Sequence, residues 1–170
     1  SNHLMSLMRN VPNFNRVVYA SSYLIYDKNL YNFDIPKSKP VKLKETDHIS
    51  PRNLTGLSKL AHEMELEFLS YFKSDKFTSI CARIYRGYGK NSRDVISRWV
   101  RDLLANKKIL VYSPEGWFDY IYAGDSAEGL IRLSNIGETG IVNLGTGRSR
   151  KVADVIKVLQ KHFPEMQLEY

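Results

Sequence analysis

Length, composition and charge already exclude several classes of protein. The chain has 170 residues, 43% of them hydrophobic, which is enough for one domain with a core and too few for two large domains. The single cysteine, Cys81, excludes a disulfide framework and a cysteine-only metal site, so we expect no metal and a reducing, cytoplasmic location. The net charge of +7 fits a site for phosphate-bearing anions or a solvated basic surface. A nucleic-acid surface is a distant third alternative without a recognition motif, so we expect no nucleic-acid partner.

The first half of the chain predicts a strand, a long loop, a helix and a second strand. Residues 17–20 are an unbroken apolar run, typical of a parallel strand covered on both faces, and Ser21 and Ser22 follow at its carboxyl end. The polar residues 27–50 predict a long loop. A helix with one buried face is predicted from the spacing of Leu57, Leu60, Ala61, Met64, Phe68 and Phe72. Residues 77–85 predict the next strand, so the two strands should be parallel with a right-handed crossover.

Shorter elements are predicted in the second half. They are a helix over 95–104, short strands over 109–112 and 119–122, a strand-to-glycine segment over 140–145 and a helix over 152–159. No apolar run approaches the ~20 residues of a membrane span, so we expect no membrane association.

The segment Pro51-Arg-Asn-Leu-Thr-Gly-Leu-Ser-Lys59 resembles the active-site helix of the extended short-chain dehydrogenases/reductases, the sugar-nucleotide epimerases and dehydratases. In that family the segment reads Pro, three residues, Tyr, three residues, Lys. Four further segments are similar to the family's motifs in the same order: 19–26, 83–89, 118–125 and 142–147. The resemblance covers nearly the whole chain and only the second half of the family's fold.

This resemblance implies an α/β protein with a Rossmann-like parallel sheet and a small α+β substrate lobe. The family's glycine-rich dinucleotide turn has no counterpart here, so residues 1–89 would be the second part of the cofactor domain, completed by a strand near 140–145. Residues 90–170 would be mostly the substrate-binding lobe. We expect a homo-oligomer. The missing amino-terminal half or a second chain should cover the sheet edge, and the absence of an initiator methionine suggests that the chain begins inside a larger protein.

The resemblance also implies roles for individual residues. In the family a lysine ammonium lowers the pKa of the catalytic tyrosine below its usual value of about 10, so that the phenol can exchange a proton with a sugar hydroxyl. The catalytic positions here are Ser22, Lys59 and Thr55, the last at the tyrosine position. The positions for NAD or NADP are Ala20, Ser21, Lys59 and Tyr85, and those for the nucleotide sugar are Ser22, Arg86 and Phe118.

Three of these residues depart from the family pattern. Thr55 has no ionised form near neutral pH, so loss of the phenol should lower the rate by roughly 10²–10⁴-fold. Its structural alternative is a helix N-cap, and Tyr23 or Tyr26 is an alternative source of a phenol. Arg86 stands at an asparagine position and Phe118 at that of a phosphate-binding arginine, which a phenyl ring cannot replace. This missing arginine is replaced by Arg86, Arg148 or Arg150, or each of these three is only a solvated surface charge.

Two functions follow from the sequence. The first is an NAD(P)-dependent epimerase/dehydratase-like protein, an isomerase of nucleotide-sugar metabolism, truncated or divergent. The alternative is a catalytically inactive relic that binds a ligand or a partner subunit. Ser22 and Lys59 favour a site still in use, and Thr55, Phe118 and the missing glycine-rich turn favour the relic.

Overall fold

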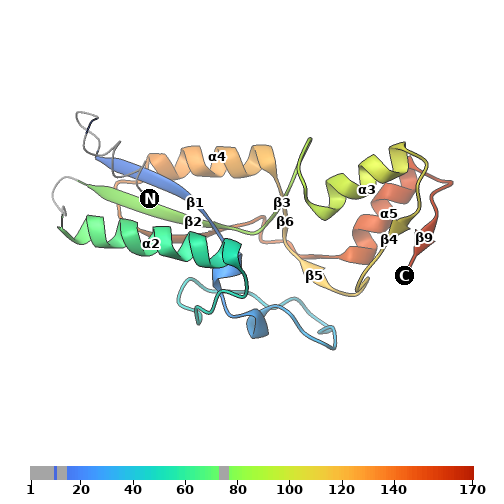
Figure 1. The fold of residues 1–170 in the computed structure, drawn as a ribbon, viewed down its shortest axis with the longest axis horizontal. Coiled ribbons are helices and arrows are strands. Elements are labelled where there is room, and N and C mark those ends of the chain that lie inside the picture. Colours follow the sequence, from blue (N-terminus) through green and yellow to red (C-terminus); the bar gives the residue numbers. More distant parts are fainter. Residues whose placement is uncertain (1–9, 11–14, 73–76) are drawn as a thin grey trace. The chain divides into compact units, whose positions relative to one another are not determined.

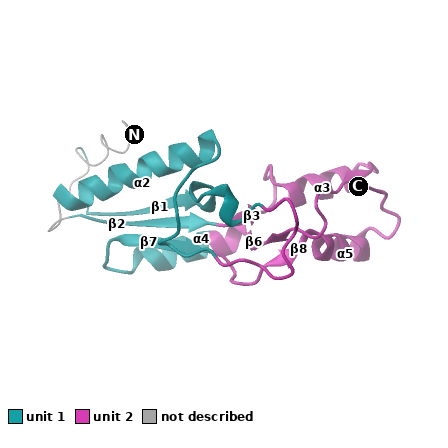
Figure 2. Cartoon of the chain, turned by 90° about the horizontal axis from the view of Figure 1, so that it is seen from below, with its two compact units in different colours: residues 1–32, 43–84, 127–144 teal, residues 33–42, 85–126, 145–170 magenta. Residues whose placement is uncertain are grey.

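The computed structural model describes residue 10 and residues 15–72 and 77–170. It divides into two compact units, coloured separately in Figure 2. Unit 1 comprises residues 1–32, 43–84 and 127–144, and unit 2 comprises residues 33–42, 85–126 and 145–170. Each has its own hydrophobic core, so each is described by itself.

A three-stranded parallel sheet forms the centre of unit 1. Its strands are β1 (Arg16–Ser22), β2 (Thr78–Ile84) and β7 (Gly140–Leu144), in the order β1-β2-β7. The register pairs Ala20 with Ala82 and Ala82 with Val142. Helix α2 (Leu54–Phe72) connects β1 to β2, which confirms the predicted strand–helix–strand unit with parallel strands.

Helices cover both faces of this sheet, as Figure 1 shows for α2 and α4 (Ala123–Ser134). Side chains alternate along β2, so Cys81 packs with Leu66 and Leu69 of α2, whereas Ile80 and Ala82 pack with Leu133 of α4. Burial raises the pKa of the Cys81 thiol to about 12, and the described residues hold no cluster of metal-ligating side chains. The cysteine is therefore an inert core residue.

The prediction of the buried face of α2 was wrong. Leu57, Met64, Phe68 and Phe72 are 54%, 60%, 61% and 65% exposed, respectively. The residues that α2 buries are instead Gly56, Glu63, Leu66 and Leu69. The helix carries two apolar stripes. The one that faces the sheet consists of Leu66 and Leu69, and the same face carries Glu63, whose carboxylate pairs with Arg83 of β2.

Asn53 and Gly56 fix the start of α2. The Asn53 Oδ1 accepts a hydrogen bond from the Gly56 backbone N–H at 2.8 Å, so Asn53 is the N-cap. The N-cap interpretation of Thr55 was therefore wrong, since Thr55 lies within the first turn. A Cβ on Gly56 would lie 2.4 Å from the Leu24 carbonyl oxygen, so only glycine lets the helix approach the short helix η1 (Tyr23–Ile25) this closely.

The loop that leaves η1 includes a second short helix, η2 (Lys28–Leu30). Its stem closes through an isolated bridge between Tyr26 and Ile49 and through a hydrogen bond from the Ser50 N–H to the Ile25 carbonyl at 3.0 Å. At the end of the loop the chain therefore lies again at the carboxyl end of β1, immediately before α2 begins.

Unit 2 is built around the helices α3 (Val95–Leu104) and α5 (Val152–His162). The α3 range confirms the predicted helix. The core of this unit consists of Trp99, Leu103, Ile109, Val111, Val152, Ile156 and Leu159. None of the described helices is long and apolar enough to cross a membrane.

Three strand pairs complete unit 2. β3 (Arg86–Tyr88) pairs in parallel with β6 (Tyr120–Tyr122), β4 (Ile109–Leu110) in parallel with β9 (Leu168–Glu169), and β5 (Trp117–Phe118) antiparallel with β8 (Arg150–Lys151). In these pairs three aromatic residues lie opposite basic ones: Tyr120 opposite Arg86, Phe118 opposite Arg150 and Trp117 opposite Lys151.

Candidate functional site

Lys59 reaches the carboxyl end of β1 from α2. Its Nζ donates a hydrogen bond to the Ala20 carbonyl oxygen at 2.7 Å and lies 5.0 Å from the centroid of the Tyr19 ring. The side chain is half-buried, so the ammonium is held at the sheet edge and keeps donors for a ligand. This is where an open α/β sheet binds its ligands.

Ser21 and Ser22 lie at the same end of β1. Ser22 Oγ accepts a hydrogen bond from the Leu24 N–H at 3.2 Å and so caps η1. Ser21 Oγ is buried and has no hydrogen-bond partner among the described residues. A buried hydroxyl without a partner is costly, so Ser21 is a point at which a ligand group could supply the missing bond.

Thr55 lies one helical turn before Lys59, on the same side of α2. Its side chain is exposed, and its carbonyl oxygen accepts a hydrogen bond from Ser58 Oγ at 3.0 Å. Gly56 next to it packs on Leu24, whose N–H binds Ser22. The three predicted catalytic positions thus lie at one end of unit 1, with an aliphatic hydroxyl where a proton-transfer group would be needed.

Tyr26 does not supply the missing phenol. Its side chain is fully buried, and its hydroxyl donates to Asn143 Oδ1 at 2.7 Å. Burial raises the pKa of Tyr26 above its usual value, although hydrogen bonding with Arg83 opposes this shift. Tyr23, the other alternative, is half-buried and packs edge-on against Tyr31 with 5.3 Å between ring centroids.

A buried ion pair next to the site was not recognised in the sequence. Arg83 Nη2 lies 2.8 Å from Glu63 Oε2, and Arg83 Nε donates to Glu63 Oε1 at 3.1 Å, so the pair is bidentate. The guanidinium also lies 4.8 Å from the Tyr26 ring centroid. The signal was present in the sequence, because Arg83 is the one charged residue in an otherwise uncharged strand, 78–84.

The same network holds the loop segment 43–45 in place. Arg83 Nη1 donates to the Glu45 carbonyl at 3.2 Å, and Asn143 Nδ2 donates to the Leu43 carbonyl at 3.1 Å. The Asn143 N–H in turn donates to Glu45 Oε1 at 2.8 Å. The buried pair therefore fixes the returning end of the long loop against β2 and β7.

In unit 2 the structure brings Arg86 and Phe118 together. The Arg86 guanidinium carbon lies 4.0 Å from the centroid of the Phe118 ring and 6.0 Å from that of Tyr120. Tyr85, half-buried, precedes Arg86 directly. Tyr85, Arg86 and Phe118 thus belong to unit 2, whereas the other predicted site residues belong to unit 1.

Asp119 organises the adjacent glycine turn. Its carboxylate accepts hydrogen bonds from the N–H groups of Thr146 at 2.9 Å and Gly147 at 2.8 Å. A Cβ on Gly145 would lie 2.8 Å from Asp119 Oδ2, so the turn needs glycine there. This explains the Gly-Thr-Gly sequence after β7 as a turn held by a carboxylate.

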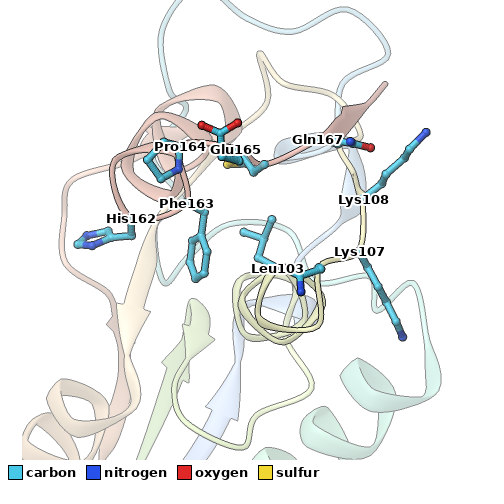
Figure 3. A pocket seen from close by; sticks show the side chains of 10 residues that line it. Leu103, Lys107, Lys108, His162, Phe163, Pro164, Glu165 and Gln167 are labelled. Atoms are coloured by element: carbon cyan, nitrogen blue, oxygen red, sulfur yellow. The ribbon is translucent and has the colours of Figure 1, made fainter.

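A pocket of about 410 Å³ lies elsewhere in unit 2, between the ends of α3 and α5 (Figure 3). Leu103 and Phe163 provide apolar lining, while the side chains of Lys107 and Lys108 extend away from Phe163. None of the predicted site residues lines it. Most of its lining residues are polar or charged, whereas a specific ligand site is mostly apolar with a few placed polar groups, so this pocket lacks the features of such a site.

Comparisons with known proteins place this geometry in context. The sequence profile of the NAD dependent epimerase/dehydratase family matches residues 1–145. No curated protein sequence matches the chain. Among solved structures, the UDP-N-acetylglucosamine 4-epimerase of Methanobrevibacter ruminantium M1, in complex with UDP-N-acetylmuramic acid, is 18% identical with a TM-score of 0.80 and covers 99% of this chain and 53% of its own.

Two further structures agree with this fold. The NAD dependent NDP-hexosamine 5,6-dehydratase TunA of tunicamycin biosynthesis is 25% identical, with a TM-score of 0.78 over 98% of this chain and 52% of its own. The UDP-N-acetylglucosamine 4-epimerase of Bacillus cereus is 23% identical, with a TM-score of 0.73; the match covers 96% of this chain and 53% of the epimerase. The chain therefore spans about half the length of the solved structures that it matches, and the Rossmann-like fold class is confirmed.

Proposed function

Because the chain belongs to the NAD-dependent epimerase/dehydratase family, we propose that it is the nucleotide-sugar-binding part of an NAD(P)-dependent epimerase or dehydratase whose proton-transfer step is impaired. The observation that carries this proposal is the position of Lys59, whose ammonium is bound to the Ala20 carbonyl at the carboxyl end of β1. An exposed Thr55 one turn away stands where the family has its tyrosine.

The residues at this end of β1 fit one part of the dinucleotide. The Lys59 ammonium and the buried Ser21 hydroxyl, which has no partner among the described residues, suit the hydroxyls of a ribose. Ser22 Oγ, which accepts a hydrogen bond from the Leu24 N–H, can also bind a sugar hydroxyl. The bound nicotinamide would accept or return a hydride. The sequence has no glycine-rich turn for the pyrophosphate, so this chain alone should hold NAD(P) weakly.

The alternative function is a catalytically inactive subunit. It is favoured by Thr55, by the buried and hydrogen-bonded Tyr26, and by the exposed apolar stripe of α2. The two functions differ in turnover by the complete protein, because the inactive subunit would only bind a ligand or a partner subunit.

Binding and turnover by the 170-residue chain test the proposal. We expect saturation-transfer NMR to detect both UDP-N-acetylglucosamine and NADH, with NADH weaker than micromolar, and no product from a panel of UDP- and dTDP-sugars. Lys59→Met should abolish the NADH signal and leave the sugar-nucleotide signal. Thr55→Tyr alone should not restore turnover.

Two results would contradict the proposal. Binding of neither ligand would remove the nucleotide-sugar function altogether. Turnover by wild type, or micromolar NAD(P) affinity measured by calorimetry, would show that the proton shuttle or the pyrophosphate site lies in residues other than those named here.

We also propose that a second copy of the chain covers the exposed stripe of α2. The stripe is defined by Leu57, Ala61, Met64, Phe68 and Tyr71, which alternate at spacings of four and three residues over four turns. It carries no charge, so two copies would not oppose like charges along the seam. Such spacing is typical of helices that pair with one another.

Sedimentation of the Phe68→Glu variant tests this surface. We expect wild type to self-associate and Phe68→Glu to be monomeric, because the change places a carboxylate inside an apolar seam. Ile131→Glu on α4, which is likewise exposed, is the matched control and should associate as wild type does. A monomeric wild-type chain, or an associating Phe68→Glu, would exclude self-association through α2.

A further inference from the structure

The hydroxyl of Tyr31 is buried and has no hydrogen-bond partner among the described residues. A phenol hydroxyl can donate one hydrogen bond and accept others, and a buried polar group that does neither destabilises the free protein. Buried polar groups in proteins are nearly always bonded, so an exception needs a physical explanation. A ligand that supplies the missing bond is one such explanation.

The long loop holds Tyr31 at the end of unit 1 where the candidate site lies. Tyr31 directly follows η2, and its N–H donates to the Lys28 carbonyl at 3.1 Å. Its ring packs edge-on against that of Tyr23, with 5.3 Å between the ring centroids. Tyr23 is the residue next to Ser22, which the proposed function assigns to the sugar. Both the backbone and the ring of Tyr31 are therefore fixed beside the residues that follow β1.

The protonation of Tyr31 makes its hydroxyl a donor. Burial raises the pKa of this phenol above its usual value; the Arg52 guanidinium opposes the shift, and Tyr23 and Asp27 add to it. The phenol therefore stays protonated near neutral pH and does not replace the proton-transfer group that the Thr55 position lacks. It can instead recognise an oxygen acceptor on a ligand.

Two other buried polar atoms without a partner among the described residues are accounted for differently. Arg16 Nε lies at the amino end of β1, and the other two nitrogens of this guanidinium donate to Thr78 Oγ1 at 3.1 Å and to the Leu133 carbonyl at 3.0 Å. Ser21 Oγ is assigned above to a ribose of the dinucleotide. Tyr31 is therefore the buried donor at this end of unit 1 that the proposed function does not use.

We propose that Tyr31 is a specificity-determining residue whose hydroxyl donates a hydrogen bond to an oxygen of the sugar ring of the nucleotide sugar, beside Ser22. This inference rests on the proposed function, since it names a group that recognises the sugar of the same ligand. The hydroxyl then finds in the complex the partner that it lacks in the free protein.

Arg52 is the movable side chain beside this hydroxyl. Its guanidinium carbon lies 5.9 Å from the Tyr31 ring centroid, and its side chain is exposed. It forms no ion pair with any residue that the structure describes. An exposed arginine without an ionic partner can turn aside while the core of unit 1 stays in place, so the sugar can approach the Tyr31 hydroxyl past it.

Tyr31→Phe tests this role because it removes the hydroxyl and keeps the ring. We expect the variant to bind UDP-N-acetylglucosamine roughly threefold to tenfold more weakly than wild type, which corresponds to the loss of one neutral hydrogen bond. The affinity for UDP, which lacks the sugar, should be unchanged. Titration of the 170-residue chain with each ligand, followed by NMR, measures both affinities. Tyr112→Phe makes the same chemical change at a side chain of unit 2 that is 68% exposed, so this control should bind both ligands as wild type does.

Thermal unfolding gives a second measurement with a different sign. Removal of a hydroxyl that has no partner should raise the unfolding midpoint of the free Tyr31→Phe variant or leave it unchanged, whereas loss of a hydroxyl bonded within the protein would lower it. Saturating UDP-N-acetylglucosamine should raise the midpoint of wild type more than that of the variant, because it binds wild type more tightly. Weaker sugar binding without loss of stability distinguishes a ligand-binding hydroxyl from a structural one.

The outcomes separate this inference from the proposed function. Equal affinity of Tyr31→Phe and wild type for UDP-N-acetylglucosamine overturns the inference and leaves the nucleotide-sugar function in place. The same holds if UDP and UDP-N-acetylglucosamine are weakened equally, or if the free variant unfolds at a lower temperature than wild type. The proposed function itself fails if wild type binds neither NADH nor the sugar nucleotide, and the inference then fails with it.

Discussion

Replacing Arg83 by methionine is expected to lower the free energy of unfolding of unit 1 by about 3–5 kcal/mol, because the change leaves the Glu63 carboxylate buried without its partner. Both side chains are almost fully buried, at 1% and 5% exposure. The substitution also releases the Glu45 carbonyl, which Arg83 Nη1 holds at 3.2 Å. Native-state hydrogen exchange of the β2 amides measures the loss.

Two further variants isolate the cause. The double variant Glu63→Leu, Arg83→Met removes both charges and should recover most of the lost stability, since an apolar pair of similar volume often replaces a buried ion pair without loss. Arg132→Met breaks the exposed pair with Glu128 on α4 and should change stability by no more than about 0.5 kcal/mol. A double variant less stable than Arg83→Met would show that the loss came from packing and not from the unpaired charge.

The fold of unit 1 could be predicted because its strands are short apolar runs joined by a long helix. The run Val17-Val18-Tyr19-Ala20 and the segment from Phe77 to Tyr85 needed only local pattern to be recognised, and their parallel pairing followed from the crossover between them. The face of α2 could not be predicted in this way. Its apolar residues form two stripes, and the buried one makes contacts that are distant in the sequence, such as the ion pair between Glu63 and Arg83, which are 20 residues apart.

The candidate site was predictable as a set of positions and not as a set of contacts. Lys59, Ser22 and Thr55 were identified by their spacing along the chain, and the structure adds that Asn53 and not Thr55 caps the helix. Arg86 and Phe118 were each noted as departures from a pattern. That they touch depends on the pairing of β3 with β6, a contact between segments 34 residues apart that no local pattern encodes.

Replacing Trp99 by alanine is the corresponding test of unit 2, and we expect it to lower the stability of this unit by about 3–5 kcal/mol. Trp99 is 3% exposed and lies in the core with Leu103, Ile109 and Ile156. Its indole Nε1 also donates to the Leu110 carbonyl at 3.1 Å, which ties α3 to β4.

Trp99→Phe separates the two contributions, since it keeps an aromatic ring in the core and removes the hydrogen bond. It should therefore cost less than Trp99→Ala, about 1–3 kcal/mol. Hydrogen exchange of the α3 and α5 amides gives both values. Equal losses in the two variants would mean that the indole hydrogen bond, and not the filled volume, stabilises the core of unit 2, whereas a loss below about 1 kcal/mol in Trp99→Ala would show that the core closes around the cavity. Phe118 of β5 packs against this core. A large loss of stability would therefore also predict that the contact between Arg86 and the Phe118 ring is lost when unit 2 unfolds.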